Sequence, residues 1–467
     1  MNDRTPVLIV DAPPGHEAAR RYILSVLLTE WLRLPCAVRI VPGLRETRFH
    51  LPADDTTVVA VPDGLFGPAT DWLSAASLPA DRPAVSDMPA WTERSGSVPL
   101  LYAAPETSSL VKQGPGRYAL TWDLLGSLFF LLTRYEEYVG TDRDAHGRYP
   151  ASRSALVGAG WHQWPVGDMY LHAFAAILRL AWPRLDARPA PYAGLAIGHD
   201  VDHPSSSMLW RGTRRGRVVA GDLFRRRSPG LAIRRASAFM PWSPPLSRRD
   251  PLNTYDTLMR ISEAARTPST FFFLAADTAT PHGSVYRVSD PWARTLIREI
   301  SGRGHRIGLH GSYGSHVSAV QLGQEWAELE RACAGAEGSL RRTVRQHFLR
   351  WEPGTTWSAQ AGAGLEQDET LAYADTVGFR AGTARSFPAY DIRSDRALAL
   401  HVQPLLVMDG ALAPLAQLDD LAAARVMELQ ARTKMYGGTF SLLWHNSSIE
   451  TQDARRRYAA LIRALSG

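Results

Sequence analysis

From residue 194 onward, short apolar runs alternate with amphipathic stretches, and this alternation constrains the fold more than any other feature of the sequence. The runs have the length and composition of strands, whereas apolar residues between them recur at helical spacing. Because strands that alternate with helices form parallel sheets, we predict an α/β fold, a distorted (β/α) barrel of about seven strands. The predicted strands are 195–197, 270–274, 306–310, 344–349, 379–382, 401–405 and 439–445, and the predicted helices are 252–265, 292–301, 320–334, 418–433 and 453–465.

The residues before this region predict a smaller α/β domain. Pro183, Pro189 and Pro191 lie in a linker rich in Pro, Ala and Arg, which marks a boundary. The predicted domains are therefore residues 1–188 and residues 189–467. Strand patterns in the first domain lie at 7–10, 37–41 and 57–61, and helical patterns lie at 17–34, 123–138 and 170–182.

The predicted helix 123–138 ends in paired acidic residues and aromatic residues, which is unusual after an apolar helix. Arg134 and Glu137 are three positions apart, so they can pair on one helical face. We favour this local ion pair over a catalytic role for the acidic residues.

Composition describes an ordinary soluble globular protein, with 45% hydrophobic and 21% charged residues. The length of 467 residues exceeds that of a typical single domain. A net charge of +6 does not indicate a nucleic-acid partner. Cys36 and Cys333 lack partners at zinc-like spacing, so neither a disulfide framework nor a cysteine metal site is predicted. We see no signal peptide and no transmembrane segment, and therefore predict a cytoplasmic protein.

Arginines crowd the segment from Arg211 to Arg235, which contains few acidic residues. We favour a solvated and partly mobile insertion as the interpretation of this segment. The alternative is contact with a phosphate-bearing substrate, or peripheral contact with an anionic membrane surface.

The first strand of the larger domain ends in His199-Asp-Val-Asp-His203. Side chains alternate along a strand, so Asp200 and Asp202 point to the same side. Two neighbouring carboxylates repel each other unless a cation or a proton lies between them. This arrangement favours a divalent metal site or a carboxylate acid/base pair over a solvated loop.

Other predicted strands also end in reactive side chains, namely His310 followed by His316, Arg345, and His445. In a barrel these strand ends converge on one face. One carboxylate and two imidazoles form a common catalytic zinc ligand set, which Asp202, His310 and His316 could supply. Asp200 could then accept a proton from water, and a histidine opposite could protonate the leaving group.

On these residues the chain resembles the polysaccharide deacetylase (NodB-homology) superfamily. It is most similar to the branch with a His-Asp-Val-Asp-His first motif and an additional N-terminal α/β domain. The second motif matches Gly304-His-Arg-Ile-Gly-Leu-His310, and the last motif matches Leu443-Trp-His445. The resemblance covers roughly Pro191 to the C-terminus. It is weaker over the N-terminal part.

The resemblance implies a role for each matching residue. It makes Asp200 the catalytic base, Asp202 and His310 metal ligands, and His445 the general acid. Arg345 matches the arginine that orients the base. The family's second histidine ligand lies four positions after the first, whereas His316 lies six positions after His310, so His347 or His203 could complete the ligand set instead.

Further residues are predicted around the ion. His199 and His203 are expected to contact the aspartates and orient them. Core packing competes with sugar contact for Trp444. The residues predicted to face the sugar are Tyr313, His347, Trp351, Trp444 and Asn446.

The resemblance implies a metal-dependent hydrolase that removes an N-acyl group, acetyl or formyl, from an amino sugar. The expected cofactor is one divalent ion, Zn²⁺. The expected substrate is a nucleotide-linked or lipid-linked amino sugar or glycan in the cytosolic synthesis of a surface glycan, with no nucleic-acid partner. The alternatives are an inactive relative that binds glycan or acts as a scaffold, and a hydrolase of a non-sugar amide.

Overall fold

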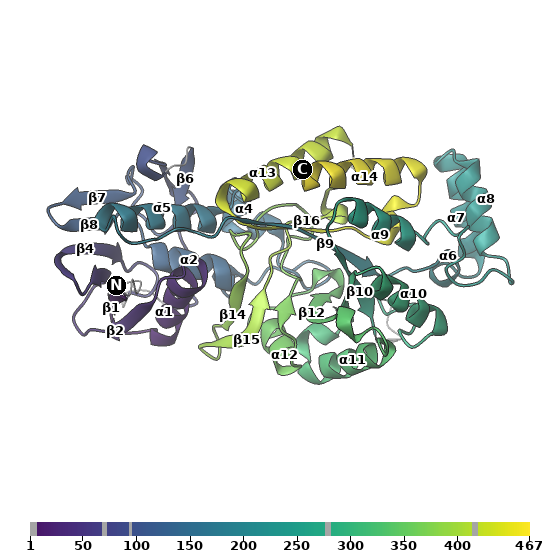
Figure 1. Cartoon of the computed structure of the whole chain (residues 1–467), viewed down its shortest axis with the longest axis horizontal. Helices are drawn as coiled ribbons and strands as arrows, with labels where there is room; N and C mark the ends of the chain where they lie inside the picture. Colours follow the sequence, from purple (N-terminus) through teal and green to yellow (C-terminus); the bar gives the residue numbers. More distant parts are fainter. Residues whose placement is uncertain (1–6, 68–71, 93–95, 276–281, 413–418) are drawn as a thin grey trace, which may run out of the picture.

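The computed structural model describes residues 7–67, 72–92, 96–275, 282–412 and 419–467. The molecule is elongated, with its N-terminal residues toward one end and helices α7 (Thr213–Ala220) and α8 (Pro229–Ala238) at the other end (Figure 1). No helix within these described ranges is both long and apolar enough to span a lipid bilayer.

A nine-stranded sheet forms the body of the C-terminal part. Neighbouring strands are parallel except for one antiparallel pair at an edge, so helices must connect most of them. In spatial order the strands are β14 (Phe387–Asp391), β15 (Arg396–Val402), β13 (Gln367–Asp368), β12 (Leu340–Gln346), β11 (Arg306–Gly311), β10 (Ser269–Leu274), β9 (Tyr192–Val201), β17 (Gly438–Leu443) and β16 (Val407–Met408).

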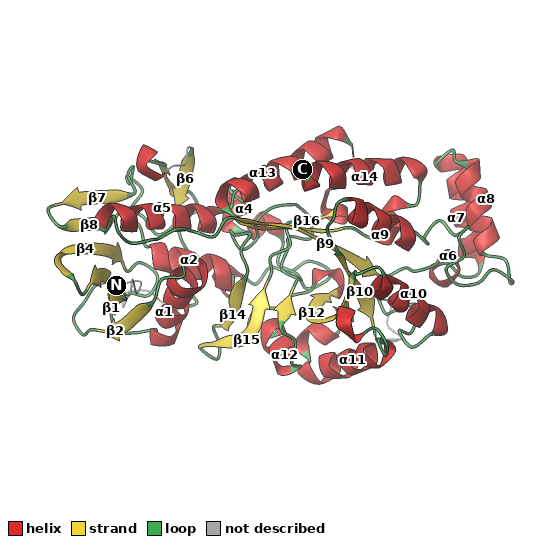
Figure 2. Cartoon of the chain, in the orientation of Figure 1, coloured by secondary structure: helices red, strands yellow, loops and turns green. Residues whose placement is uncertain are grey.

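The connecting helices flank this sheet. In Figure 2, α9 (Tyr255–Ala264), α13 (Asp420–Tyr436) and α14 (Gln452–Ser466) lie above the strands. Helices α10 (Pro291–Gly302), α11 (Ala319–Ala332) and α12 (Thr356–Gly362) lie below them. Apolar residues at helical spacing explain this packing, as in α10, where Ala293, Leu296, Ile297 and Ile300 are buried.

The N-terminal part contains a six-stranded mixed sheet and a separate strand pair. The sheet order is β2 (Cys36–Ile40), β1 (Leu8–Ala12), β3 (Glu46–Leu51), β4 (Asp54–Pro62), β8 (Arg117–Leu120) and β7 (Val111–Gly114). The pair is β5 (Ala84–Asp87) and β6 (Ser97–Leu100), and the helices are α1 (Glu17–Leu24), α2 (Leu124–Thr133), α3 (Tyr135–Val139), α4 (Ala155–Gly158) and α5 (Val166–Ala181).

The N-terminal and C-terminal parts share one hydrophobic core. The rings of Tyr22 and Phe129 lie 4.6 and 5.5 Å from the ring of Tyr390 on β14. The Tyr22 hydroxyl also donates a hydrogen bond of 2.8 Å to the carbonyl of Pro388. The division into two domains at residue 188 therefore stays a prediction, because packing is continuous across it.

A buried ion network crosses the same contact. Glu137 accepts hydrogen bonds from Arg134 at 2.9 Å and from Arg380 at 3.0 and 2.6 Å. Glu136 pairs with Arg134 and accepts from Ser154 at 2.9 Å. The predicted local pair between Arg134 and Glu137 is therefore present, and the C-terminal part supplies a second arginine.

The mixed α/β character agrees with the prediction, but the barrel of about seven strands is not confirmed. The sheet has nine strands, and β14 and β16 are its open edges among the described residues. Residues 379–382, predicted as a strand, form an irregular buried loop. Gly378 and Gly382 bracket this loop with φ values of +147° and +66°, which a regular strand does not allow. The predicted start of a helix at Leu418 lies outside the described residues.

Candidate active site

The carboxyl ends of adjacent parallel strands bring the predicted site residues to one edge of the sheet. Asp200 on β9 is in register with Phe272 on β10. His310 on β11 is in register with Leu274 on β10 and with Arg345 on β12. Strand β17 lies on the other side of β9 and leads into His445. Residues distant in sequence therefore meet at the strand ends, where parallel sheets place their ligands.

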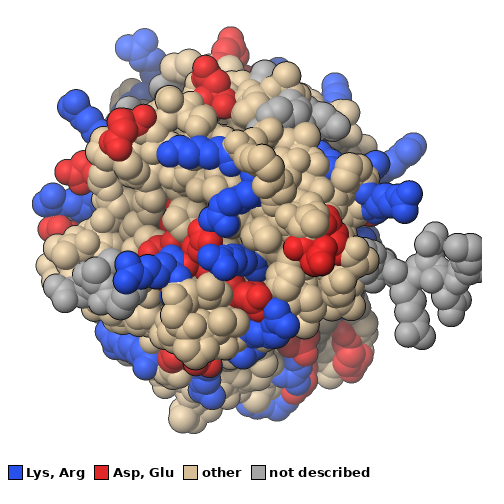
Figure 3. All heavy atoms as spheres, turned by 90° about the vertical axis from the view of Figure 1, so that its left-hand side faces the viewer, with Lys and Arg blue, Asp and Glu red and all other residues tan. Residues whose placement is uncertain are grey.

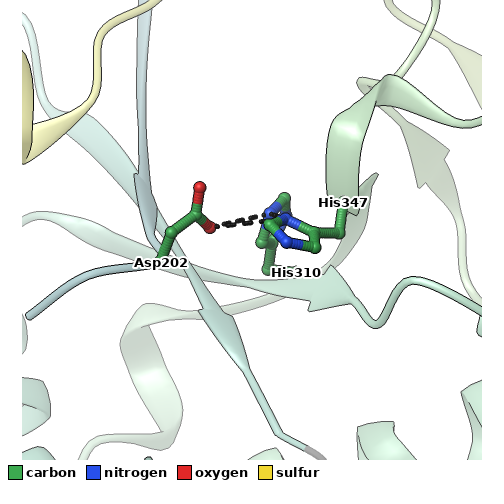
Figure 4. A group of neighbouring side chains, drawn as sticks. All are labelled: Asp202, His310 and His347. Atoms are coloured by element: carbon green, nitrogen blue, oxygen red, sulfur yellow. Dashed lines mark hydrogen bonds and ion pairs between the residues drawn. The ribbon is translucent and has the colours of Figure 1, made fainter. Parts of the chain in front are cut away.

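Asp202, His310 and His347 form a compact group (Figure 4). The Nε2 atom of His310 lies 3.1 Å from Oδ1 of Asp202 and 3.0 Å from Nδ1 of His347. The Nδ1 atom of His347 lies 3.6 Å from Oδ1 of Asp202. Each residue thus directs one potential ligand atom toward a common point.

Hydrogen bonding fixes which atom of His310 faces this point. Its Nδ1 lies 2.7 Å from the carbonyl of Arg345, so Nδ1 carries the hydrogen and donates it. In the neutral ring Nε2 is then an acceptor that faces the Asp202 carboxylate, whose buried Oδ1 has no hydrogen bond of acceptable geometry. Acceptors in this arrangement repel one another unless a cation lies between them.

The pKa values agree with this need for a cation. Burial lowers the pKa of His347 to about 4, against the attraction of Asp202, so its ring is neutral near pH 7. Burial lowers the pKa of His310, but Asp200 and Asp202 outweigh burial and raise it, which means that His310 gains a proton when no other cation is present. Either a proton or a metal ion can therefore satisfy the group.

The dimensions fit a small divalent ion. Three ligand atoms about 2.0–2.1 Å from a tetrahedral ion lie about 3.3 Å from one another. The three separations of 3.0, 3.1 and 3.6 Å bracket this value. One carboxylate with two imidazoles is also a ligand set that leaves a coordination position open. These residues fit a zinc-type ion without rearrangement of the backbone.

Asp200 is held beside this group by Arg345. The Nη1 atom of Arg345 donates to Oδ1 of Asp200 at 2.8 Å, and Glu369 accepts from its Nη2 at 3.1 Å. The guanidinium lies 4.1 Å above the ring of Phe272. A Cβ atom on Gly198 would come within 2.5 Å of the guanidinium, so the glycine makes room for it. The other oxygen of Asp200, Oδ2, faces Nε2 of His310 at 3.8 Å.

His445 lies on the opposite side of Asp202 and is held by Asp409. Its Nδ1 donates to Oδ1 of Asp409 at 2.7 Å, and its backbone N–H donates to Oδ2 at 2.9 Å. Nε2 is left facing Oδ2 of Asp202 at 3.6 Å. Burial lowers the pKa of His445, but the charge and hydrogen bond of Asp409, with Asp202 and Asp200, outweigh burial and raise it to about 10. Asp409 therefore holds the ring in place, and Nε2 carries a proton that it can donate.

His347 reaches the group because the chain turns sharply after β12. Phe348 and Leu349 have φ values of +60° and +53°, a conformation that is costly for residues other than glycine. The predicted strand 344–349 is therefore too long, since β12 ends at Gln346. The turn brings His347, one of the two predicted alternatives to His316, to the group.

His316 lies outside the group, so the structure does not bring together the predicted ligand set of Asp202, His310 and His316. It lies in the short turn Ser315–Val317, with its ring buried. Burial, with the charge of Arg350, lowers its pKa to about 4. The six-residue spacing after His310 runs through an N-capped turn into α11 and does not bend back to the ion position.

Other predicted residues have different surroundings from those expected. His199 points to the opposite side of β9 from Asp200, and within the described ranges it has no hydrogen bond to an aspartate. Its Nδ1 donates to the carbonyl of Trp444 at 2.8 Å. Trp444 is buried and stacks on Tyr458 at 4.9 Å, so core packing accounts for it. Trp351 is likewise buried, with its ring 4.8 Å from that of Trp357.

Two further predicted residues, His203 and Asn446, lie at or contact the loop that follows Asp202. His203 is half-buried, and its pKa is lowered by burial against the attraction of Asp202. Asn446 is buried and donates to the carbonyls of His203 and Leu252, both at 2.9 Å. Asn446 therefore ties this loop to the segment before α9 and does not face an open site.

Tyr313 belongs to a half-buried aromatic cluster beside His347. Its hydroxyl lies 3.2 Å from Nδ1 of His146, and its ring lies 4.6 Å from that of His282. Phe348 contacts the rings of His146 and His347 at 4.4 and 4.5 Å. Because His146 comes from the N-terminal part, both parts of the chain build this wall next to the ion group.

Sequence reasoning missed Glu369 and Asp409. Asp409 directly follows the apolar run Leu405-Leu-Val-Met408, so a strand end carrying a carboxylate was visible there. Glu369 follows β13, which has only two residues and leaves little apolar pattern to detect.

Comparisons with known proteins give distant likenesses. A family model described as a family of unknown function (DUF7033) matches residues 8–183, and no curated protein matches. A structure from Mycobacterium smegmatis, provisionally described as a polysaccharide deacetylase, is 18% identical, covers 58% of this chain and 86% of its own, and has a TM-score of 0.34. A family 4 carbohydrate esterase from Streptomyces lividans in complex with acetate is 13% identical, covers 58% and 88%, and has a TM-score of 0.28. At these TM-scores neither likeness carries an argument about activity.

Proposed function

We propose that the protein is a metal-dependent hydrolase that removes an N-acyl group, acetyl or formyl, from an amino sugar. The observation that carries the proposal is the meeting of three ligand atoms, from Asp202, His310 and His347, in which Oδ1 of Asp202 has no hydrogen-bond partner among the described residues and faces the unprotonated Nε2 of neutral His310. The Asp200 carboxylate, held by Arg345, and the His445 imidazole, held by Asp409, flank this group. This combination supports hydrolysis better than a purely structural role.

A bound divalent ion, which we expect to be Zn²⁺, would polarise the acyl carbonyl and make water easier to deprotonate. Asp200 accepts the proton of the attacking water on Oδ2, because Oδ1 is engaged by Arg345. His445 donates the proton on Nε2 to the departing nitrogen, because Nδ1 is engaged by Asp409. The C–N bond breaks, and a carboxylic acid and a free amine result.

The aromatic cluster around Tyr313 supports a sugar as substrate. It stands directly beside His347, and its rings are only half-buried. Aromatic faces pack against the apolar faces of sugar rings, while the Tyr313 hydroxyl and the His146 ring offer polar contacts. A nucleotide-linked or lipid-linked substrate in cytosolic surface-glycan synthesis stays a prediction.

The test combines an activity assay with metal analysis. The zinc-loaded protein is incubated with N-acetyl and N-formyl amino sugars, and release of acetate or formate is measured. We expect Asp200→Asn to lower kcat by about 10²–10⁴-fold while it retains the ion. Asp202→Asn should lose both the ion and the activity.

Asp453→Asn, at an exposed ion pair on α14, is the matched control and should change neither. An Asp200→Asn variant with full activity would contradict the role of the base. A wild-type protein that binds no divalent ion would instead support a glycan-binding scaffold.

A further inference from the structure

We propose that the segment from Arg211 to Trp242, here called the arginine hairpin, docks the protein on an anionic lipid membrane. The hairpin consists of α7, a short π-helical turn, and α8. It stands at the far end of the molecule from the N-terminal sheet (Figure 1). The proposal concerns where the protein binds and does not depend on the proposed activity.

The exposed charges of the hairpin are of one sign. The only acidic residue between Arg211 and Arg249 is Asp222, which is buried and pairs with Arg226 and Arg235. No ion pair of the exposed hairpin arginines other than those of Arg226 occurs within the described part of the chain. The exposed arginines are Arg211, Arg214, Arg217, Arg225, Arg226 and Arg227.

The opposite end of the molecule has a different surface. Figure 3 shows that acidic and basic side chains are interspersed on the face at the N-terminal end. The whole chain carries a net charge of only +6, so the hairpin is a local concentration of positive charge. Such a concentration beside a binding surface attracts anionic partners.

Large apolar side chains are exposed among these arginines. Trp242 is 79% exposed, Phe224 is 76% exposed and Ile233 is 70% exposed, and Leu223 and Met240 add to the set. Trp242 and Phe224 are the only aromatic side chains among the exposed large hydrophobic residues of the described chain. Burial of this surface would be favourable, yet no described residue of the chain covers it.

The hairpin is anchored at its base by buried ion pairs, while its exposed arginines agree with the solvated segment that the sequence predicts. Arg235 is fully buried, donates to Asp222 at 2.5 Å and to Glu450 at 2.7 Å, and lies 4.7 Å above the ring of Trp210. A buried arginine with two carboxylate partners holds the hairpin in one orientation.

The combination of groups fits a membrane better than other anionic partners. Arginine guanidinium groups bind lipid phosphates, and Trp and Phe insert at the level of the headgroups. Aliphatic side chains such as Ile233 and Met240 have a favourable environment among acyl chains but none along a nucleic-acid backbone. We therefore commit to an anionic bilayer surface.

Docking would also orient the candidate active site. The hairpin follows the loop that carries Asp202, and Glu450, which anchors Arg235, comes shortly after His445. The hairpin base is thus tied to two of the segments that carry site residues, those of Asp202 and His445. If the proposed function holds, a membrane-attached amino sugar would be presented to a site held close to the surface.

The test is co-sedimentation of the full chain with vesicles of phosphatidylcholine alone and of phosphatidylcholine with phosphatidylglycerol in equal parts. We expect binding only to the anionic vesicles, with loss at high salt. The double variant Phe224→Ser/Trp242→Ser and the triple variant Arg214→Gln/Arg217→Gln/Arg225→Gln should each weaken binding at least about tenfold. Val320→Ser/Leu421→Ser, at exposed apolar positions elsewhere, is the matched control and should bind as the wild type does.

Absence of vesicle binding by the wild type, or equal binding to both vesicle types, would overturn the proposal. Tighter binding to duplex DNA or to polyglutamate than to anionic vesicles would also overturn it, in favour of another class of partner. Hydrolysis of a soluble amino-sugar substrate should be the same in the hairpin variants and the wild type. Vesicle binding therefore tests the docking proposal, and hydrolysis of the soluble substrate tests the proposed activity independently.

Discussion

Two buried clusters of charged residues differ in how their charges are satisfied. In the network of Arg134, Glu136, Glu137 and Arg380, opposite charges alternate and each carboxylate accepts hydrogen bonds from within the chain. In the group of Asp202, His310 and His347, Oδ1 of Asp202 has no hydrogen-bond partner in the described part of the chain and faces the unprotonated Nε2 of neutral His310.

The comparison separates a structural cluster from a functional one. The network is complete without any added atom and joins the two parts of the chain. Its role is therefore structural, and removal of one partner should lower the free energy of unfolding. The ion group is incomplete, and its neutral state is unfavourable unless a cation enters. Burial does not distinguish the two clusters, because both are buried. They differ in whether each acceptor has a hydrogen donor.

The largest expected effect comes from breaking the network. Glu137→Gln leaves Arg134 and Arg380 without their shared carboxylate in a buried position, and should lower the free energy of unfolding by about 3–5 kcal/mol. Denaturant unfolding measures this loss. Asp453→Asn, at an exposed pair on α14, should cost about 0.5 kcal/mol or less.

The same experiment on the ion group should depend on the metal. Zn²⁺ should raise the free energy of unfolding of the wild type but not that of Asp202→Asn, because the variant lacks a ligand. Zn²⁺ should leave the effect of Glu137→Gln unchanged, and equal stabilisation of the wild type and Asp202→Asn by Zn²⁺ would show that Asp202 is not a ligand.

A smaller effect is expected at Asp409, which acts on the reaction through His445. Asp409→Asn should lower kcat about 10–100-fold, with KM and ion content unchanged, because His445 loses the charge that orients and protonates it. Steady-state kinetics and metal analysis check this outcome. A rise in KM with an unchanged kcat would indicate that Asp409 shapes substrate binding instead.

The sequence predicted the site in part because its residues end apolar runs. Asp202 and His310 are such residues, and the structure brings them to 3.1 Å. His347 was predicted only as an alternative to His316 for the third ligand, because residues 348 and 349 continue the apolar pattern while their backbone turns through positive φ. Strand periodicity carries no information about that turn.

The fold was predictable to a similar extent. The alternating patterns gave the mixed α/β class, yet β13 and β16 have two residues each and leave no periodicity to detect. The segment 379–382, predicted as a strand, is a loop, because Gly378 and Gly382 adopt positive φ. The shared core around Tyr390 depends on contacts distant in sequence, which local patterns do not encode.

The most direct test of the central claim is an anomalous-scattering map of crystals grown with Zn²⁺. We predict one peak about 2.0–2.2 Å from Oδ1 of Asp202, Nε2 of His310 and Nδ1 of His347, and loss of this peak in His347→Ala but not in His316→Ala. A peak bound by His316 in place of His347, or no peak among these side chains, would contradict the account.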